Sequence, residues 1–508
     1  MVGSPKTFNR ILNFVSIKLQ CLSLLKRCSS MKQLLQIHSQ LQINGFHEDD
    51  DVINKIVTFC SLEPSGSLNY AQLLIQNTNT SLIFPWNTLI RGHATRGSSR
   101  QALTAFSVMR AITSIRPDEL TYSFLFKACA SLSVSTEGKM IHVDVLKYGL
   151  DSELYVQNNL INFYGQCQLI MDARKVFDSM TYRSIVSWNS IISVCVDNSC
   201  FRESIELSCK MQRCGFEPNE TTAVVLLSAS GELGNLSFGK WIHSQVITKQ
   251  LDMNCQLGTS LVDMYSKCGD LHYAEQVFDT MPITTVWTWS ALIMGLAQHG
   301  RGNEALRVFD KMKDERVRPN GITFLGVLCA CSHAGLVEEG IRYFHEMENF
   351  HGIKPSMMHH GAMVDVFCRA GRVREAYDFV RKKMHVIRPD AVVWRTLLQA
   401  CNVHDVNDSS GIGKKVKKRL LKLEPRRGGN FVMMANKWAE VGMWEKAKRI
   451  RNRMSEKGLE KMSGTSLIEI NGSAHRFFSG NNGQVSHLGI CILLDSLEIH
   501  MKSDAVLG

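Results

Sequence analysis

Short apolar segments recur in pairs along the chain, and each pair has the spacing of a helical hairpin. In residues 188–219 a first segment carries apolar residues at helical spacing, a polar turn follows at 197–199, and a second amphipathic segment ends at Gly215 and Pro218. The pattern resets about every 31–36 residues. One hairpin is too small to bury its apolar face alone. The sequence therefore predicts an all-α fold, an α-solenoid superhelix of stacked helix-turn-helix repeats.

A longer period of about 101 residues runs through the hairpins. Related five-residue segments begin at Trp86, Trp188, Trp289 and Trp394, and prolines stand 101 residues apart at positions 117, 218 and 319. A chain of 508 residues exceeds the roughly 250–300 residues at which a single core stops growing, and stacked repeats avoid that limit. Tetratricopeptide-like repeats are the other solenoid considered, but their period of about 34 residues and their signature are absent.

These landmarks resemble the pentatricopeptide repeat family, specifically its plant organellar class of alternating P, L and S motifs. In that frame residues 19–82 hold a degenerate L-S pair and residues 83–390 hold three P-L-S triplets. The P motifs are 83–118, 185–219 and 286–320, the L motifs 119–153, 220–254 and 321–356, and the S motifs 154–184, 255–285 and 357–390.

The sequence after residue 390 resembles the family's E subgroup. Residues 391–470 resemble the E motifs, although Ser463 replaces an expected proline, and residues 471–508 read as a short eroded extension. Longer members end in a zinc deaminase domain, whose chemistry requires His-x-Glu and Cys-x-x-Cys. Neither motif occurs in this sequence. We therefore expect no deaminase domain, no enzymatic activity and no cofactor.

The resemblance also implies which residues read RNA, because each repeat of this kind reads one base. The fifth and last residues of a repeat form a pair. Asn87 with Asp118 implies uracil, Asn158 with Ser184 cytosine, Asn189 with Asn219 a pyrimidine, Thr259 with Thr285 a purine, and Ser290 with Asn320 adenine. In the L motifs the fifth residues are Ser123, Val224 and Leu325. The two apolar ones offer no hydrogen-bonding group and are expected to act as spacers.

Other candidate chemistry has a structural explanation. The 16 cysteines include no metal-site spacing and are expected to be buried thiols. His142 and His243 recur at the repeat period, which indicates a packing role. The four repeated tryptophans are expected in the core. No apolar stretch approaches the roughly 20 residues of a membrane span.

Charge is concentrated near the two ends of the chain. Residues 411–461 hold 16 Lys/Arg against five Glu, while the whole chain carries +11. This basic segment either docks a partner protein or neutralises RNA phosphates. Residues 1–18 are basic, free of acids and amphipathic, as in an organellar presequence. We expect a mitochondrial location, with the chloroplast as the alternative.

The resemblance implies a sequence-specific, single-stranded RNA-binding protein that selects a cytidine for C-to-U editing. The resemblance implies two partners, a deaminase-bearing pentatricopeptide repeat protein in trans and organellar RNA editing factor proteins. Transcript stabilisation or splicing, and a protein-binding scaffold, are the alternatives. Counting from the edited cytidine, the expected target has U at −12, C at −10, a pyrimidine at −9, a purine at −7 and A at −6.

Overall fold

The computed structural model describes residues 17–78, 82–384, 387–404, 411–460, 464–470 and 473–478. The expected targeting segment therefore lies almost wholly outside the described residues, as does most of the expected extension. The chain divides into two compact units, Met1–Ala229 and Ser230–Gly508. Each unit is described by itself.

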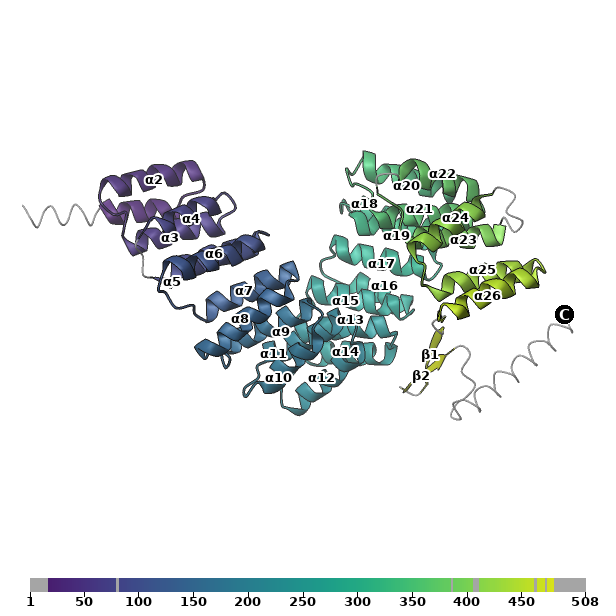
Figure 1. The fold of residues 1–508 in the computed structure, drawn as a ribbon, viewed down its shortest axis with the longest axis horizontal. Coiled ribbons are helices and arrows are strands. Elements are labelled where there is room, and N and C mark those ends of the chain that lie inside the picture. The colour runs from purple at the N-terminus through teal and green to yellow at the C-terminus, as the bar shows by residue number, and fades with distance from the viewer. Residues whose placement is uncertain are drawn as a thin grey trace, which may run out of the picture. The chain divides into compact units, whose positions relative to one another are not determined.

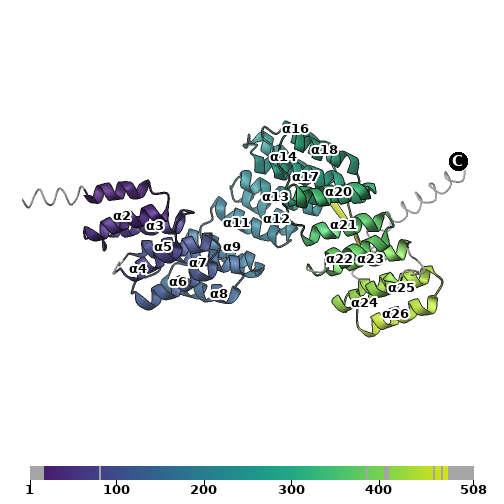
Figure 2. The same ribbon diagram turned by 90° about the horizontal axis from the view of Figure 1, so that it is seen from above.

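The first unit consists of successive antiparallel helices that stack in chain order (Figures 1 and 2). A helical segment at residues 17–26 precedes them. The labelled helices are α2 (Met31–Ile43), α3 (Asp50–Leu62), α4 (Leu68–Gln76), α5 (Ile83–Thr95), α6 (Ser99–Ile112), α7 (Glu119–Leu132), α8 (Ser135–Tyr148), α9 (Leu154–Gln166), α10 (Ile170–Ser179), α11 (Ile185–Asp197) and α12 (Phe201–Arg213).

The second unit repeats the arrangement, and α13 (Glu220–Leu233) crosses the boundary. Its further helices are α14 (Leu236–Thr248), α15 (Cys255–Lys267), α16 (Leu271–Thr280), α17 (Val286–Gln298), α18 (Gly302–Asp314), α19 (Gly321–Ala334), α20 (Val337–Asn349), α21 (Met357–Arg369), α22 (Val373–Lys383), α23 (Ala391–His404), α24 (Ile412–Leu423), α25 (Gly428–Glu440) and α26 (Trp444–Glu456). The predicted solenoid of helix-turn-helix repeats is confirmed.

Contacts between neighbouring hairpins place the odd-numbered helices in a row. In the first unit α3 contacts α5, α5 contacts α7, α7 contacts α9 and α9 contacts α11. In the second unit the same succession links α15 through α25. The even-numbered helices α4 to α12 and α16 to α26 pack against their hairpin partners, and several also contact the next odd-numbered helix. We call the odd-numbered helices first helices, because each one opens a repeat.

The repeated tryptophans lie in the core, as predicted. Trp86, Trp188 and Trp289 are each 1% exposed, and Trp394 is 8% exposed. Trp188 meets Phe177 edge-to-face with ring centroids 4.8 Å apart, and Trp289 meets Phe278 in the same way at 4.7 Å. Each of these aromatic pairs joins the second helix of one repeat to the first helix of the next, so it ties the two repeats together.

The recurrent histidines also have the predicted packing role. His142 and Tyr164 share a hydrogen bond of 2.8 Å, and His243 and Tyr265 one of 2.9 Å. Burial lowers the pKa of both imidazoles, so they favour the neutral form. Each pair links the second helix of an L motif to the first helix of the following S motif.

The cysteines are only partly as predicted. Of the 15 described cysteines, all are free and seven are buried, whereas Cys214 at the end of α12 is exposed. Burial raises the pKa of Cys195 to about 12, which suppresses its thiolate. Of the seven half-buried thiols, five lie at helix ends or turns, whereas Cys209 and Cys329 lie within α12 and α19; the apolar pattern alone did not separate them from core positions.

A short β-hairpin, which the sequence analysis did not predict, follows the all-α solenoid. Residues Thr465–Ile470 form strand β1, which pairs antiparallel with β2 at Ser473–Phe478. Thr465 lies opposite Phe478 and Ile470 opposite Ser473. The strands flank the sequence Asn471-Gly472, the dipeptide most typical of a two-residue hairpin turn.

Among the described helices, none is long and apolar enough to cross a membrane.

Two neighbouring tryptophans test the packing of α17. Trp289→Ala removes a buried indole and should destabilise its unit by about 3–5 kcal/mol. Trp287 is 57% exposed, so Trp287→Ala should change stability by less than about 0.5 kcal/mol. Urea unfolding followed by circular dichroism measures both. Equal losses in the two variants would contradict the assignment of Trp289 to the core.

Candidate nucleic-acid interface

The last residue of each repeat stands at the N-cap of the next first helix. Asp118 caps α7, Ser184 caps α11, Thr285 caps α17 and Asn320 caps α19. The fifth residue of a repeat lies about one turn inside the preceding first helix. Because first helices are neighbours, the two members of a predicted pair face each other across adjacent repeats.

Asn87 and Asp118 form the most completely bonded pair. The Asn87 amide nitrogen lies 2.9 and 3.0 Å from the two carboxylate oxygens of Asp118. The Thr121 hydroxyl lies 2.6 Å from the Asn87 amide oxygen and accepts from the Asp118 backbone N–H at 3.2 Å. This network fixes the orientation of the Asn87 amide. One amide hydrogen and one carbonyl lone pair remain for a ligand.

Asn189 and Asn219 repeat that network with an amide in place of the carboxylate. The Asn189 amide nitrogen donates to Asn219 Oδ1 at 3.2 Å, and Thr222 Oγ1 lies 2.6 Å from Asn189 Oδ1. Thr222 also donates its backbone N–H to Asn219 Oδ1 at 3.0 Å. The Asn219 amide nitrogen is left as a donor, whereas Asp118 offers only acceptors.

In the second unit a threonine stands between the two members of each pair. Ser290 Oγ lies 2.7 Å from Thr323 Oγ1, and the backbone N–H of Thr323 donates to Asn320 Oδ1 at 2.9 Å. Likewise Thr259 Oγ1 lies 2.7 Å from Thr288 Oγ1, which accepts the Thr285 backbone N–H at 3.2 Å. The structure brings both pairs together through this intermediate hydroxyl.

Asn158 and Ser184 are not joined by a hydrogen bond. Ser184 and Ser187 cap α11 reciprocally, but the buried Asn158 Oδ1 has no partner. Asn158 is 8% exposed, so its amide oxygen is an unsatisfied acceptor at a reading position. An unpaired buried acceptor costs about 1–3 kcal/mol, which a ligand donor would offset.

Sequence reasoning missed the residue that connects four of the five pairs and that, at Ser187, only completes the helix cap. It is the third residue of the following repeat, and it reciprocates the helix cap: Thr121, Ser187, Thr222, Thr288 and Thr323. A capping box is usually recognised by Glu or Gln at this position. The serine or threonine found here was therefore not identified as a signal.

A second group that sequence reasoning missed is a set of exposed apolar side chains. The second residue of most repeats is large and apolar, yet between 41% and 63% exposed: Phe84, Leu120, Tyr155, Val186, Trp287, Ile322, Met358 and Val392. Thr221 and Gln256 are the polar exceptions. An apolar residue that stays exposed at a repeated position, beside the polar pair, indicates a surface for flat apolar ligands.

The L-motif positions differ from the P and S positions. Val224 and Leu325 are only half-buried and have no polar group, in keeping with spacers. Ser123 is 1% exposed, and its hydroxyl has no hydrogen-bond partner. Ser123 is thus as buried as Ser290, but unlike Ser290 it has no hydrogen-bond link to the next repeat.

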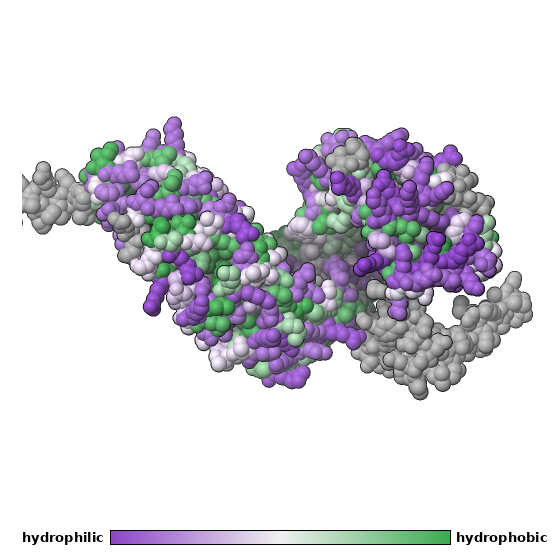
Figure 3. Space-filling model, viewed as in Figure 1, coloured by the Kyte–Doolittle hydropathy of each residue, from purple (hydrophilic) through white to green (hydrophobic). Residues whose placement is uncertain are grey.

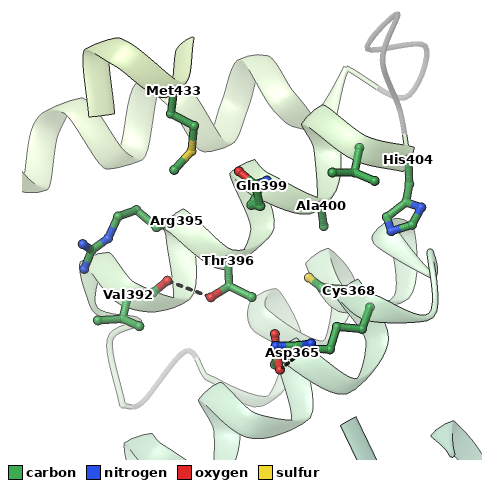
Figure 4. A pocket seen from close by; sticks show the side chains of 11 residues that line it. Asp365, Cys368, Val392, Arg395, Thr396, Gln399, Ala400, His404 and Met433 are labelled. Atoms are coloured by element: carbon green, nitrogen blue, oxygen red, sulfur yellow. Dashed lines mark hydrogen bonds and ion pairs between the residues drawn. The ribbon is translucent and has the colours of Figure 1, made fainter. Parts of the chain in front are cut away.

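The row of first helices continues into the expected E motifs, where its chemistry changes. A cavity of about 470 Å³ lies among α21, α23 and α25, and Figure 4 shows Arg395, Gln399 and Met433 around it. Val392 and Arg395 occupy the second and fifth positions of α23. The Arg395 guanidinium lies 3.9 Å from Glu424, so the fifth position carries an ion-paired cation where the five predicted pairs carry an amide or hydroxyl.

The described residues contain no group of three or more His, Cys, Asp or Glu side chains placed to hold a metal ion.

The connecting hydroxyl can be tested at Thr121. Thr121→Val keeps the shape but leaves the buried Asn87 amide oxygen without its donor, and should destabilise the first unit by about 1–3 kcal/mol. Thr104→Val, on the exposed face of α6, is the matched control and should change stability by less than about 0.5 kcal/mol. Urea unfolding measures both, and equal effects would show that the network does not stabilise the repeat.

Comparison with known proteins identifies the repeats. The sequence pattern described as PPR repeat matches residues 84–112, 158–185, 186–216, 259–282, 322–351 and 351–382, and that described as PPR repeat family matches 284–333. The E motif pattern matches residues 408–469.

Relatives cover almost the whole chain. Pentatricopeptide repeat-containing protein At2g36730 of Arabidopsis thaliana is 50% identical over 492 residues, 97% of each chain. A second Arabidopsis relative, At1g59720, named chloroplastic/mitochondrial, is 38% identical over 90% of this chain and 73% of its own. The crystal structure of maize PPR10 with an 18-nucleotide psaJ RNA element has a TM-score of 0.56 at 17% identity, covering 86% of this chain and 74% of that chain, and therefore shares the fold. The chain belongs to the pentatricopeptide repeat family, in its plant PLS class with an E motif.

Proposed function

We propose that this protein binds single-stranded RNA sequence-specifically and selects a cytidine for C-to-U editing in an organelle. The observation that carries the proposal is the repeated juxtaposition of a polar pair and an exposed apolar residue along the row of first helices. Single-stranded bases present both a flat face and a hydrogen-bonding edge, and each repeat offers a partner for both.

The exposed apolar residues suit the faces of the bases. Stacking of a base on an aromatic side chain is worth about 1–3 kcal/mol and is insensitive to sequence. Phe84, Tyr155 and Trp287 are exposed aromatic residues at the second position. Stacking would hold successive bases beside the polar pairs, and the pairs would then discriminate among them.

The remaining donors and acceptors support the expected base at two P motifs. Uracil presents an N3–H donor, which the acceptor-only Asp118 beside Asn87 can bind. Cytosine presents an N3 acceptor, which the Asn219 amide nitrogen beside Asn189 can bind. Uracil carbonyl oxygens are acceptors too, so this donor supports the expected pyrimidine at the second of these repeats.

The smaller fifth residues suit purines. Ser290 and Thr259 lack the amide of asparagine. Each hydroxyl donates to a backbone carbonyl of its own helix and lies 2.7 Å from a threonine hydroxyl of the next repeat. The space left by the missing amide accommodates the larger purine. The Asn320 amide nitrogen remains as a donor beside Ser290, and the N1 atom of adenine is an acceptor.

The E motif supports an editing role, with catalysis supplied by a deaminase-bearing pentatricopeptide repeat protein in trans. Organellar RNA editing factor proteins are the second proposed partners. The second helices of the first two L motifs have apolar outer faces on which they could dock: Met140, Val143 and Leu146 on α8, and Trp241 and Ile247 on α14, are 39–66% exposed. Every residue of α20 in the third L motif is described, and none is large, apolar and exposed.

The basic, amphipathic residues 1–18 favour a mitochondrial location, with the chloroplast as the alternative. The names of related proteins include both organelles. The proposed target has U at −12, C at −10, a pyrimidine at −9, a purine at −7 and A at −6.

Base reading is tested at Asn87. Asn87→Thr with Asp118 retained should change the preference at −12 from U to G. One mismatched base pair costs about 1–3 kcal/mol in protein–DNA recognition, and at about 1.4 kcal/mol relative affinity already changes tenfold. Competition binding of two RNAs that differ only at this nucleotide measures the change.

The matched control for that experiment is Asn159→Thr. Asn159 is exposed on α9, in a different repeat from Asn87, and its amide donates to the Tyr155 carbonyl. It should leave the preference for U intact. If Asn87→Thr weakens binding of both RNAs equally, or changes neither, Asn87 does not read this base.

The editing role is tested by sequencing organellar transcripts from a plant line lacking the protein. We expect one or more cytidines preceded by the proposed target sequence to be unedited, while neighbouring sites remain edited. Altered transcript ends or unspliced introns with normal editing would instead support stabilisation or splicing. Absence of single-strand RNA affinity in filter binding would support a protein-binding scaffold and overturn the proposal.

A further inference from the structure

A second cavity lies where the last predicted S motif meets the first expected E motif. It has a volume of about 610 Å³ and is formed by the end of α22, the start of α23, the segment between them and the end of α24. Its apolar lining includes Val380, Met384 and Trp394, which are at most 8% exposed. We call it the α22–α24 pocket.

Four cations surround this apolar lining, and no acidic residue does. They come from three separate parts of the chain: Arg381 on α22, Arg388 before α23, and Arg419 and Lys422 on α24. All four are exposed, and none makes a hydrogen bond or ion pair with another described residue. Unpaired cations brought together around one concave surface are held against their mutual repulsion, which a bound anion would relieve.

Arg388 lines the pocket and also lies just before α23, one of the first helices. Arg388 and Pro389 directly precede Asp390, whose side chain accepts the backbone N–H of Val393 in the first turn of α23. The same sequence of cation, proline and capping residue occurs before α7, α19 and α21, at Arg116, Arg318 and Lys354. All of these cations are exposed, whereas Glu217 occupies the register before α13.

In these repeats a cation stands two residues before the helix-capping side chain that is proposed to contact the edge of a base. The RNA backbone must pass close to that point, because each phosphate lies between two consecutive nucleotides. The α22–α24 pocket adds three further cations beside Arg388. It lies at the repeat boundary after which the ion-paired Arg395 occupies the fifth position.

We propose that the α22–α24 pocket binds the phosphodiester backbone of RNA immediately 3′ of the nucleotides that the repeats read. The inference rests on the proposed function for the direction of the RNA, whose 3′ side follows the later repeats. The cations hold the phosphates without regard to sequence, and the apolar lining accepts a ribose or base. An acidic protein segment has similar charge, but the register shared with the reading positions favours RNA.

The experiment compares two RNAs with the full-length protein. The sequence is first selected by the wild-type protein from a random pool; one RNA ends at the last nucleotide read by the repeats, and the other extends four nucleotides further in the 3′ direction. Affinity is measured over a range of salt concentrations. Each phosphate contact adds about −0.7 to the slope of log affinity against log salt, so four contacts would add up to about −2.8 for the extended RNA.

The test variant carries Arg381→Gln, Arg388→Gln, Arg419→Gln and Lys422→Gln. It should lose most of the additional slope with the extended RNA and bind the shorter RNA with the wild-type slope. The matched control removes four exposed cations from α26, where Figure 3 shows a hydrophilic surface: Lys448→Gln, Arg449→Gln, Arg451→Gln and Arg453→Gln. The control should retain the additional slope.

Three results would overturn the proposal. An unchanged extension-dependent slope in the test variant would assign the pocket to something other than RNA, such as an acidic protein segment. An equal loss in the α26 control would indicate diffuse charge instead of a defined site. If the wild-type protein selects no RNA, the proposed function fails as well. This outcome differs from failure of the pocket proposal alone, because the shorter RNA then also fails to bind. Circular dichroism melting verifies that both variants are folded.

Discussion

The helix cap that joins one repeat to the next is the interaction on which the candidate interface depends. A helix leaves its first backbone N–H groups without partners inside the helix, and a side chain at the N-cap satisfies one of them. Here the cap of each first helix is also the last residue of the preceding repeat. The residue that completes a helix therefore stands beside the fifth residue of the neighbouring repeat, and the connecting threonine holds the two together.

This arrangement explains how flexible polar side chains become fixed without a large core. The Asn87 amide is almost fully buried, but it gains three hydrogen-bond contacts from Asp118 and Thr121. Its conformational entropy is lost during folding, before any ligand binds. A preorganised hydrogen-bonding edge discriminates between bases better than a mobile one, because binding then carries a smaller ordering cost.

The sequence was sufficient for the features that depend on periodicity. The helical hairpins, the repeated core tryptophans and the packing of His142 and His243 follow from spacing alone. The β1–β2 hairpin was not predicted, because residues 391–470 were assigned by their resemblance to the E motifs. The Asn471-Gly472 turn signal and the alternating residues before it were given less weight than that resemblance. The family resemblance supplied the reading pairs, but their hydrogen-bond connections required coordinates. The spacing alone does not show that the oxygen of Asn158 lacks a partner while that of Asn87 is bonded to Thr121.

The last residue of a repeat caps the next first helix and is also proposed to contact a base. These two roles limit the residue types that suit this position. Side chains that cap a helix well are short and polar: Asn, Asp, Ser and Thr. The five last residues in the predicted pairs are Asp118, Ser184, Asn219, Thr285 and Asn320, which draw on those four types alone. A residue with a different hydrogen-bonding edge, such as Gln or Arg, would offer new base contacts but leave the helix poorly capped. Helix stability, as well as the chemistry of the bases, thus restricts the residue types available for the proposed base recognition.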